Sequence, residues 1–318
     1  MNQTLSEIIK NNFSVDEQTF IDAINDPTNA GARGSILGAI SENLLKKYLI
    51  NNNFSTFRIV EKPKGGFDEK NDEARGDFYI QAKNEKDDKW LVVESKGLKS
   101  NSEKHGHNFY DREKCFIWLK NKIKKKNKEE IYEKGLKVYL QSKNKWLKKN
   151  PNKKFPDFGW NKNSPGSEVY NLDNLFKNET ELKKWIYSLP ENLFKKENVD
   201  IGKGAISIIM THMPSTRIGP ITEIKSTGPL KGEFSILAVD LFFRTGKHNF
   251  IFASSDDLSH QSKSPEHLSQ NYTIDILLHG IKKDPIIQFP WFENINECIK
   301  SSNLIYKKID KSQLDERT

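Results

Sequence analysis

The chain has few of the features that cross-link a protein through disulfides or metal ions, or that hold it in a membrane. Its two cysteines, Cys115 and Cys298, lie far apart without Cys-x-x-Cys spacing, so neither a disulfide framework nor a structural zinc site is expected. No apolar run approaches the roughly 18 residues that a membrane span needs. Residues 1 to 10 lack the basic-then-apolar pattern of a signal peptide. These absences favour a soluble, cytoplasmic protein with no membrane partner.

Arginine is also scarce, although the chain is basic. The formal net charge is +8, and only 7 of the 51 basic residues are arginine. Such a charge favours a polyanionic partner, but a lysine-rich composition also follows from the codon usage of an A/T-rich genome. The chain has no P-loop and no internal repeat, so neither a nucleotide cofactor nor a repeat architecture is expected.

Two β-prone runs predict a hairpin that organises the rest of the chain. The runs are Phe78 to Ala82 and Trp90 to Val93, and a short polar stretch of hairpin-loop length joins them. Symmetric pairing about this loop places Asp77 opposite Glu94, with Cβ atoms about 4.5–5.5 Å apart. Because side chains alternate along a strand, Glu94 and Lys96 share a face. A slip of one residue would undo this arrangement, and the sequence alone does not fix the register.

Two carboxylates and an ammonium on one surface can support phosphodiester hydrolysis. Mg²⁺ usually binds one or two carboxylates together with water and substrate phosphate. A neighbouring lysine can orient or deprotonate a metal-bound water, or hold a phosphate. In a chain that is 30% charged, ordinary ion pairs on a surface hairpin would give the same pattern. The functional interpretation gains support because Glu94 and Lys96 directly follow an apolar run, where charge is disfavoured.

At these residues the chain resembles the PD-(D/E)XK nuclease superfamily, which includes many type II restriction endonucleases. Asp77 and the tripeptide Glu94-Ser95-Lys96 match the family pattern, while Gly76 replaces the usual proline before the aspartate. The resemblance implies that Asp77 and Glu94 bind Mg²⁺ together with the Ser95 carbonyl group. It also implies that Lys96 positions or activates the attacking water.

Three further residues could belong to this site. Members of the resembled family often carry an acidic residue on the helix before the catalytic strands. Glu42, in the amphipathic helix expected over Ile36 to Ile50, is the position that could match as a metal ligand. A solvated glutamate on the flank of the helix is an explanation at least as good. His105 and His107 could reach a phosphate or a metal, although most such pairs are ordinary loop histidines.

A basic segment follows the candidate site. Residues 119 to 154 hold fourteen lysines and three glutamates, a balance of +11, so the rest of the chain is net acidic. We expect this helical segment, with Lys124, Lys125 and Lys126, to contact the DNA backbone; the alternative is a solvated surface helix. Further candidates for DNA contact lie on expected turns or loops: Arg217, Arg244, Lys247 and His248. Ordinary turn chemistry explains these four residues equally well.

Together these patterns predict a mixed α/β fold. A central mixed β-sheet flanked by helices, similar to the restriction-endonuclease core, would carry a basic helical insert. Residues 1–110 would hold the N-terminal helices and catalytic strands, 111–198 the DNA-contacting insert, and 199–318 a β-rich part that completes the core and reads the target. The three parts are expected to form one compact fold. The elements expected in the last part are a strand over 205–210, a hairpin with a basic tip over 234–253, strands over 273–278 and 285–289, and a helix over 295–306.

The resemblance implies a Mg²⁺-dependent type II site-specific endonuclease that acts on double-stranded DNA. Many enzymes of this kind are homodimers that cut palindromes. One alternative is another nuclease of the same superfamily, with a role in repair, phage defence or modification-dependent cleavage. A second is a non-catalytic DNA-binding module with a degenerate site, although the intact acid–acid–lysine set argues against it.

Overall fold

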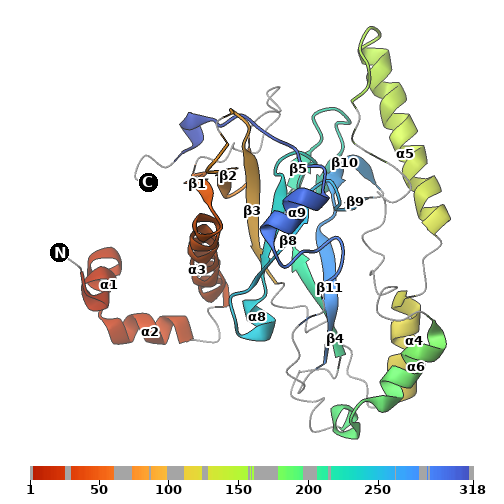
Figure 1. Cartoon of the computed structure of the whole chain (residues 1–318). Coiled ribbons are helices and arrows are strands. Elements are labelled where there is room, and N and C mark those ends of the chain that lie inside the picture. The colour runs from red at the N-terminus through yellow and green to blue at the C-terminus, as the bar shows by residue number, and fades with distance from the viewer. Residues whose placement is uncertain are drawn as a thin grey trace.

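The computed structural model describes residues 3–25, 30–60, 74–85, 87–98, 111–123, 128–156, 158, 160, 178–195, 206–213, 216–261, 263–278, 285 and 287–314. Over these residues the chain forms a mixed α/β fold, which confirms the predicted class (Figure 1). None of the helices in these ranges combines the length and the apolar character that a membrane span requires.

A five-stranded mixed sheet forms the centre of the fold. Its strands, in spatial order, are β1 (Phe54–Arg58), β2 (Phe78–Ala82), β3 (Leu91–Gly97), β7 (Ile236–Asp240) and β8 (Phe250–Ser254). The pair β3 and β7 is parallel, whereas every other neighbouring pair is antiparallel. The first hundred residues and the last third of the chain therefore build one sheet and share its core.

Two helices cover one face of this sheet. Leu45 and Leu49 of α3 (Ala30–Asn51) lie one helical turn apart and are fully buried against the strands. Ile295 and Cys298 of α9 (Ile295–Ser301) bury their side chains in the same cluster. The structure confirms the helix expected over 36–50, but α3 begins earlier, at Ala30.

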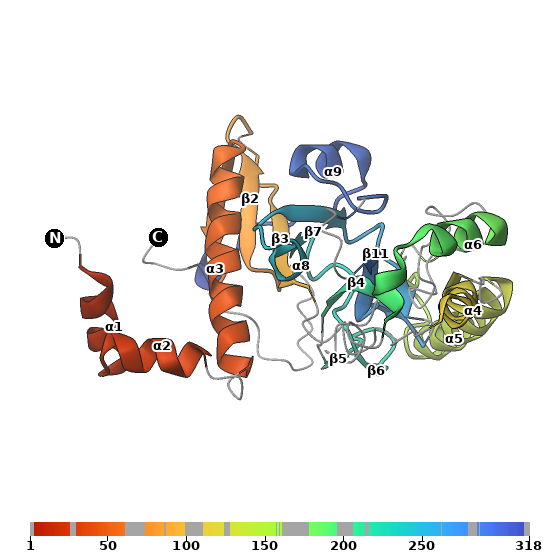
Figure 2. The ribbon, with the colours of Figure 1, turned by 90° about the horizontal axis from the view of Figure 1, so that it is seen from below.

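Short β-ribbons from the last third of the chain cover the opposite face. They are β4 (Ile206–His212) with β11 (Asn271–Leu278), β5 (Thr216–Ile218) with β6 (Lys225–Thr227), and β9 (His260–Gln261) with β10 (Ser264–Leu268). Their core side chains, such as Leu268 and Tyr272, share a buried cluster with Val92 and Leu237 of the central sheet. In Figure 2, α9 lies on one side of β7, whereas β5 and β6 lie on the opposite side.

Helices of the basic insert lie at the far side of the molecule from the N-terminal helices α1 (Leu5–Phe13) and α2 (Glu17–Asn25) (Figures 1 and 2). The insert contains α4 (Arg112–Ile123), α5 (Lys128–Lys149) and α6 (Glu179–Ser188). It follows that the insert and the N-terminal helices flank the central sheet from opposite sides.

Three elements expected in the last third differ from the structure. The strands β7 and β8 pair as predicted, but the short helix α8 (Phe242–Thr245) begins their connection. Of the strand expected over 285–289, the described residues 285 and 287–289 form no strand, and a turn from Gln288 to Trp291 follows. The closing helix stops at Ser301 because the chain then extends to Lys307, whose backbone pairs with Trp90 beside β3.

Candidate active site

The register of the β2–β3 hairpin is the one that symmetric pairing predicts. Phe78 faces Val93, Tyr79 faces Val92 and Ile80 faces Leu91. Continuing the same series by one pair brings Asp77 beside Glu94. The prediction about the register is therefore confirmed over the paired residues, and both acids lie where β2 begins and β3 approaches its end.

Backbone groups of β3 hold Asp77 in place. Its N–H donates to the carbonyl oxygen of Val93 at 2.8 Å, and its Oδ2 accepts the N–H of Ser95 at 2.7 Å. Only 6% of Asp77 is exposed. Because its carboxylate accepts a backbone N–H of the neighbouring strand, Asp77 is fixed against the stretch that carries Glu94 and Lys96.

Gly76 allows this close approach. A Cβ atom at this position would lie 2.4 Å from Cγ1 of Val92 and 2.7 Å from the carbonyl oxygen of Val93. Real Cβ atoms are essentially never found so close to other heavy atoms, so any larger residue would push the chain away from β3. The glycine that replaces the usual proline is therefore required by packing and delivers Asp77 to the site.

Lys96 inserts a positive charge among these oxygens. Its ammonium donates to the Glu94 carboxylate and, at 3.0 Å, to the carbonyl oxygen of Ser95. Burial alone would lower the pKa of Lys96, but attraction by Glu94, Asp77 and Glu42 outweighs it, so the pKa is raised. The site thus contains a protonated lysine whose charge neighbouring carboxylates stabilise.

Glu42 lies within electrostatic reach of the site, on α3. Its carboxylate forms an ion pair with Arg58 of β1, and a quarter of its side chain remains exposed. Its negative charge nevertheless contributes to the raised pKa of Lys96. The structure therefore brings the helix acid near Lys96, and its ion pair is with an arginine of the edge strand.

The oxygen donors of the site suit a hard cation. Asp77 and Glu94 supply carboxylates, and the Ser95 carbonyl group already accepts a hydrogen bond from a cationic group. Within the described ranges, no three His, Cys, Asp or Glu side chains gather closely enough to hold a metal ion. Mg²⁺ fits this partial set, because it commonly binds one or two carboxylates and keeps water or substrate phosphate as its other ligands.

The connection between β7 and β8 lies beside the strand end that carries Lys96, because Gly97 pairs with Asp240 in the parallel ladder. Asp240 is buried, and its Oδ2 lies 2.6 Å from Nδ1 of His248, whose ring stacks on Phe242. Lys247 is exposed next to His248. The structure thus holds His248 against Asp240, the residue that pairs with Gly97 at the end of β3, and Lys247 directly precedes it in the connection.

The other predicted contacts lie elsewhere or outside the described residues. Arg217 lies in β5, where its Nε is 2.8 Å from Oε1 of Glu233. Arg244 belongs to α8, but its side chain lies outside the described part of the structure. The same is true of the whole residues Lys124, Lys125, Lys126, His105 and His107.

The aromatic side chains of α5 pack inward. Tyr132 and Tyr139 both stack on Trp160, and Trp146 meets Phe155 edge to face. These rings fix the following loop against the helix. They are used for packing, and the exposed lysines of α5 form its outward surface, among them Lys134, Lys137 and Lys148.

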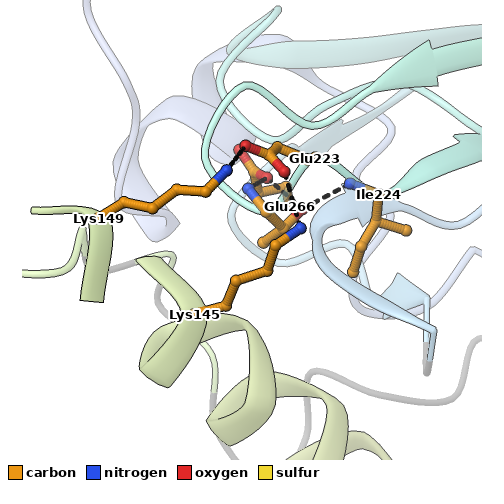
Figure 3. Close-up of polar contacts among 6 residues, drawn as sticks. Lys145, Lys149, Glu223, Ile224 and Glu266 are labelled. Atoms are coloured by element: carbon orange, nitrogen blue, oxygen red, sulfur yellow. Dashed lines mark hydrogen bonds and ion pairs between the residues drawn. The ribbon is translucent and has the colours of Figure 1, made fainter. Parts of the chain in front are cut away.

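Two lysines of α5 are already paired with an acid of the C-terminal part (Figure 3). The Nζ atoms of Lys145 and Lys149 lie 2.7 and 2.5 Å from the carboxylate oxygens of Glu223. Hydrogen bonds from these lysines lower the pKa of Glu223 to about 2. Beneath Glu223, the buried carboxylate of Glu266 accepts the N–H of Thr222 at 2.6 Å. Part of the positive charge of the segment is therefore neutralised within the chain.

Sequence reasoning missed three residues around the site. Arg75, which directly precedes Gly76 and Asp77, pairs with Glu233, and Asp240 orients His248. The position of Arg75 was a usable signal. Glu233 and Asp240 gave none, because their roles depend on partners brought close only by the fold.

Comparisons of this chain with protein-family models, with curated proteins and with solved structures find no match. The fold and the site define the chain as a mixed α/β protein with an acid–acid–lysine cluster at the end of a central hairpin.

Proposed function

We propose that the protein is a Mg²⁺-dependent endonuclease that hydrolyses phosphodiester bonds of double-stranded DNA, of the type II restriction class that the sequence resemblance implies. The observation that carries the proposal is the position of the Lys96 ammonium, which contacts Glu94 and the Ser95 carbonyl group and is attracted by Asp77. Glu94 and the Ser95 carbonyl group are among the oxygens that the resemblance assigns to metal binding, and both accept a hydrogen bond from the Lys96 ammonium.

Each residue of the cluster has a distinct role in this proposal. Asp77 and Glu94, with the Ser95 carbonyl group, would hold Mg²⁺, which supplies an activated water and counter-charge for the phosphate. Lys96, whose ammonium donates to Glu94 and to the Ser95 carbonyl group, would donate a hydrogen bond that positions the attacking water or a phosphate oxygen, or would help to activate that water. The water oxygen would bond to phosphorus as the P–O bond to the leaving strand breaks, while the attacking water gives up a proton to solvent and the departing oxygen takes up a proton from solvent.

Two further parts of the proposal concern the substrate. Lys247 and His248, near the strand end that bears Lys96, would contact DNA close to the scissile bond. A homodimer that cuts a palindrome follows from the resemblance to type II enzymes and belongs to the same proposal.

Incubation of the purified protein with plasmid DNA tests the function. With Mg²⁺ we expect discrete fragments, and with EDTA intact plasmid. A smear would favour a nonspecific nuclease of the same superfamily. Binding without cleavage would favour a DNA-binding module with a degenerate site, and neither binding nor cleavage would refute the proposal. Sequencing the ends of the fragments would then give the target and the position of the cut.

A further inference from the structure

Two arginines share one buried carboxylate beside the candidate active site. Oε1 of Glu233 lies 2.8 Å from Nε of Arg217 and 3.5 Å from Nε of Arg75. The Glu233 side chain is only 8% exposed. Because guanidinium groups stay charged at any ordinary pH, the two arginines carry two positive charges, and the single carboxylate neutralises only one of them.

The backbone fixes this cluster relative to the catalytic hairpin. Arg75 stands two residues before Asp77, and its N–H donates to the carbonyl oxygen of Glu233 at 2.9 Å. Two residues after Glu233, the N–H of Ser235 donates to the carbonyl oxygen of Val92 at 2.8 Å. The close packing at Gly76 removes the remaining freedom of the segment. The backbone of Arg75 and Glu233 is therefore held next to the central sheet, and Arg217 reaches the Glu233 carboxylate from β5.

Both arginines keep donors for a ligand. A guanidinium group carries five N–H donors in a planar fork that matches phosphate oxygens. In addition to its contact with Glu233, Arg217 donates from Nη1 to the carbonyl oxygen of Thr216 at 3.2 Å. No acceptor within the described ranges binds the terminal nitrogens of Arg75. The side chains of Arg75 and Arg217 remain 15% and 26% exposed.

This arrangement suits an anion better than a purely structural ion pair. One carboxylate would satisfy one arginine, whereas a second, largely desolvated guanidinium group adds repulsion that costs free energy. A phosphate would neutralise the excess charge and accept hydrogen bonds from the remaining N–H groups of both guanidinium groups. On the proposed substrate, the neighbouring phosphates of the cleaved strand are the anions nearest to Asp77.

We propose that Arg75 and Arg217 together bind one backbone phosphate of DNA next to the scissile bond, and that Glu233 is the positioning residue that holds the two guanidinium groups side by side. This inference rests on the proposed nuclease function. It assigns a role to Arg75 and specifies a backbone phosphate as the DNA contact of Arg217.

The salt dependence of DNA binding tests whether Arg75 and Arg217 bind a phosphate together. The affinity for a fluorescent duplex of mixed sequence is measured in EDTA over a range of NaCl concentrations, for the wild type and for Arg75→Gln, Arg217→Gln and the double variant. We expect the double variant to reduce the slope of log K against log salt by about 0.9, the contribution of one neutralised phosphate. Lys89→Gln is the matched control, because Lys89 forms an exposed ion pair with Asp87 at the other end of the same hairpin. Its slope should equal that of the wild type.

Glu233→Gln separates positioning from simple charge. This change makes the protein more positive, so a carboxylate without a positioning role predicts tighter DNA binding. A positioning role predicts weaker binding, because the two guanidinium groups lose the carboxylate that holds them side by side. Arg75→Lys, which keeps the charge and the partner but loses the fork, should bind with intermediate affinity. Melting temperatures show which variants remain folded.

The outcomes distinguish this inference from the proposed function. A double variant that melts at lower temperature but keeps the wild-type salt slope would show that the cluster is a structural ion pair, and would overturn the proposed phosphate site. Cleavage by the wild type would in that case leave the nuclease proposal standing. Tighter binding by Glu233→Gln would overturn the positioning role. A wild-type protein that binds no duplex would overturn both proposals.

Discussion

The β2–β3 hairpin and helix α5 both carry charge, but they use it in opposite ways. In the hairpin, few charged groups are involved, and each is held from several directions: Asp77 by the Ser95 N–H, and Lys96 by Glu94 and the Ser95 carbonyl group. On α5, most lysines lie at the surface, and Lys145 and Lys149 are paired with a single acid.

This difference shows what kind of sequence evidence fixes a site. Strand pairing is local and has a period of two, so the length of the hairpin loop decides which side chains meet. A lysine-rich segment gives only an amount of charge. Whether that charge faces DNA, solvent or another part of the chain depends on packing that is distant in sequence, such as the turn that carries Glu223 (Figure 3).

The largest expected effect concerns the hairpin. Asp77→Ala, Glu94→Ala and Lys96→Ala should each reduce plasmid cleavage by a factor of roughly 10² to 10⁴, the usual contribution of a positioned catalytic group. DNA binding in EDTA should persist, because most of the proposed phosphate contacts, such as those of Arg75 and Arg217, lie outside these three residues. Asp87→Ala, at the other end of the hairpin, is the control and should cleave normally. Cleavage at the wild-type rate by Lys96→Ala would falsify the assigned mechanism.

Local patterns predicted the hairpin and its register well. The apolar runs, the short polar loop and the alternation of side chains were enough to bring Asp77 beside β3. The main helix is also predicted, but the apolar pattern begins only at Ile36, whereas α3 begins at Ala30 and includes Gly31 and Gly34. Helix propensity is a weak guide at such positions, because tertiary context can override it.

Contacts between distant segments could not be predicted. The pairing of Gly97 with Asp240 brings His248 close to the end of β3, yet the two segments lie more than a hundred residues apart. The basic character of the β7–β8 connection is visible in the sequence, but the strand that lies beside it is not. For the same reason, Glu233 carried no signal before the fold placed it between two arginines.

Buried and exposed ionisable groups extend the comparison to stability. His260 is almost fully buried, and burial lowers its pKa from 6.5 to about 4. A histidine with a lowered pKa in the folded state contributes stability above pH 6.5 that is lost as the pH falls to about 4. With roughly 1.4 kcal/mol for each pKa unit, this loss is about 3 kcal/mol. Urea denaturation over this pH range should show it.

His260→Gln is the matching variant, because the side-chain amide of glutamine can still donate to the Pro265 carbonyl group that Nδ1 of His260 contacts. The pH dependence of its unfolding free energy should be flatter between pH 6.5 and 4. Some dependence should remain, since burial also lowers the pKa of His267. An unchanged pH profile would show that His260 is protonated as readily in the folded as in the unfolded protein.

Gly76 offers a smaller and more local change. Gly76→Ala should destabilise the protein by roughly 1–3 kcal/mol, the usual cost of overpacking, because its Cβ would overlap Val92 and Val93. It should also reduce cleavage by moving Asp77 away from β3. Gly38→Ala is the control, since a Cβ at this exposed position of α3 meets nothing within 4 Å. There, helix propensity predicts a gain of up to about 1 kcal/mol. Equal melting temperatures for the two variants would contradict the packing argument.

The smallest effects per residue are expected on α5, where two sets of lysines can be compared. Lys134, Lys137 and Lys148 are exposed, and no acid in the described ranges pairs with them. If this surface contacts DNA, their replacement by glutamine should reduce the salt slope of binding by up to about 0.9 per lost phosphate contact. Lys145→Gln with Lys149→Gln should change the slope less, because Glu223 already neutralises part of their charge.

A carboxyl titration by NMR provides the internal check on this last comparison. The double variant of Lys145 and Lys149 should raise the pKa of Glu223 from about 2 towards the ordinary range, since hydrogen bonds from these lysines lower it. The triple variant should leave it unchanged. Equal slopes for both sets, with Glu223 at its ordinary pKa in the wild type, would mean that the ion pairs do not persist in solution. All the lysines of the helix would then be equally available to DNA, and composition would be as informative on α5 as spacing is on the hairpin.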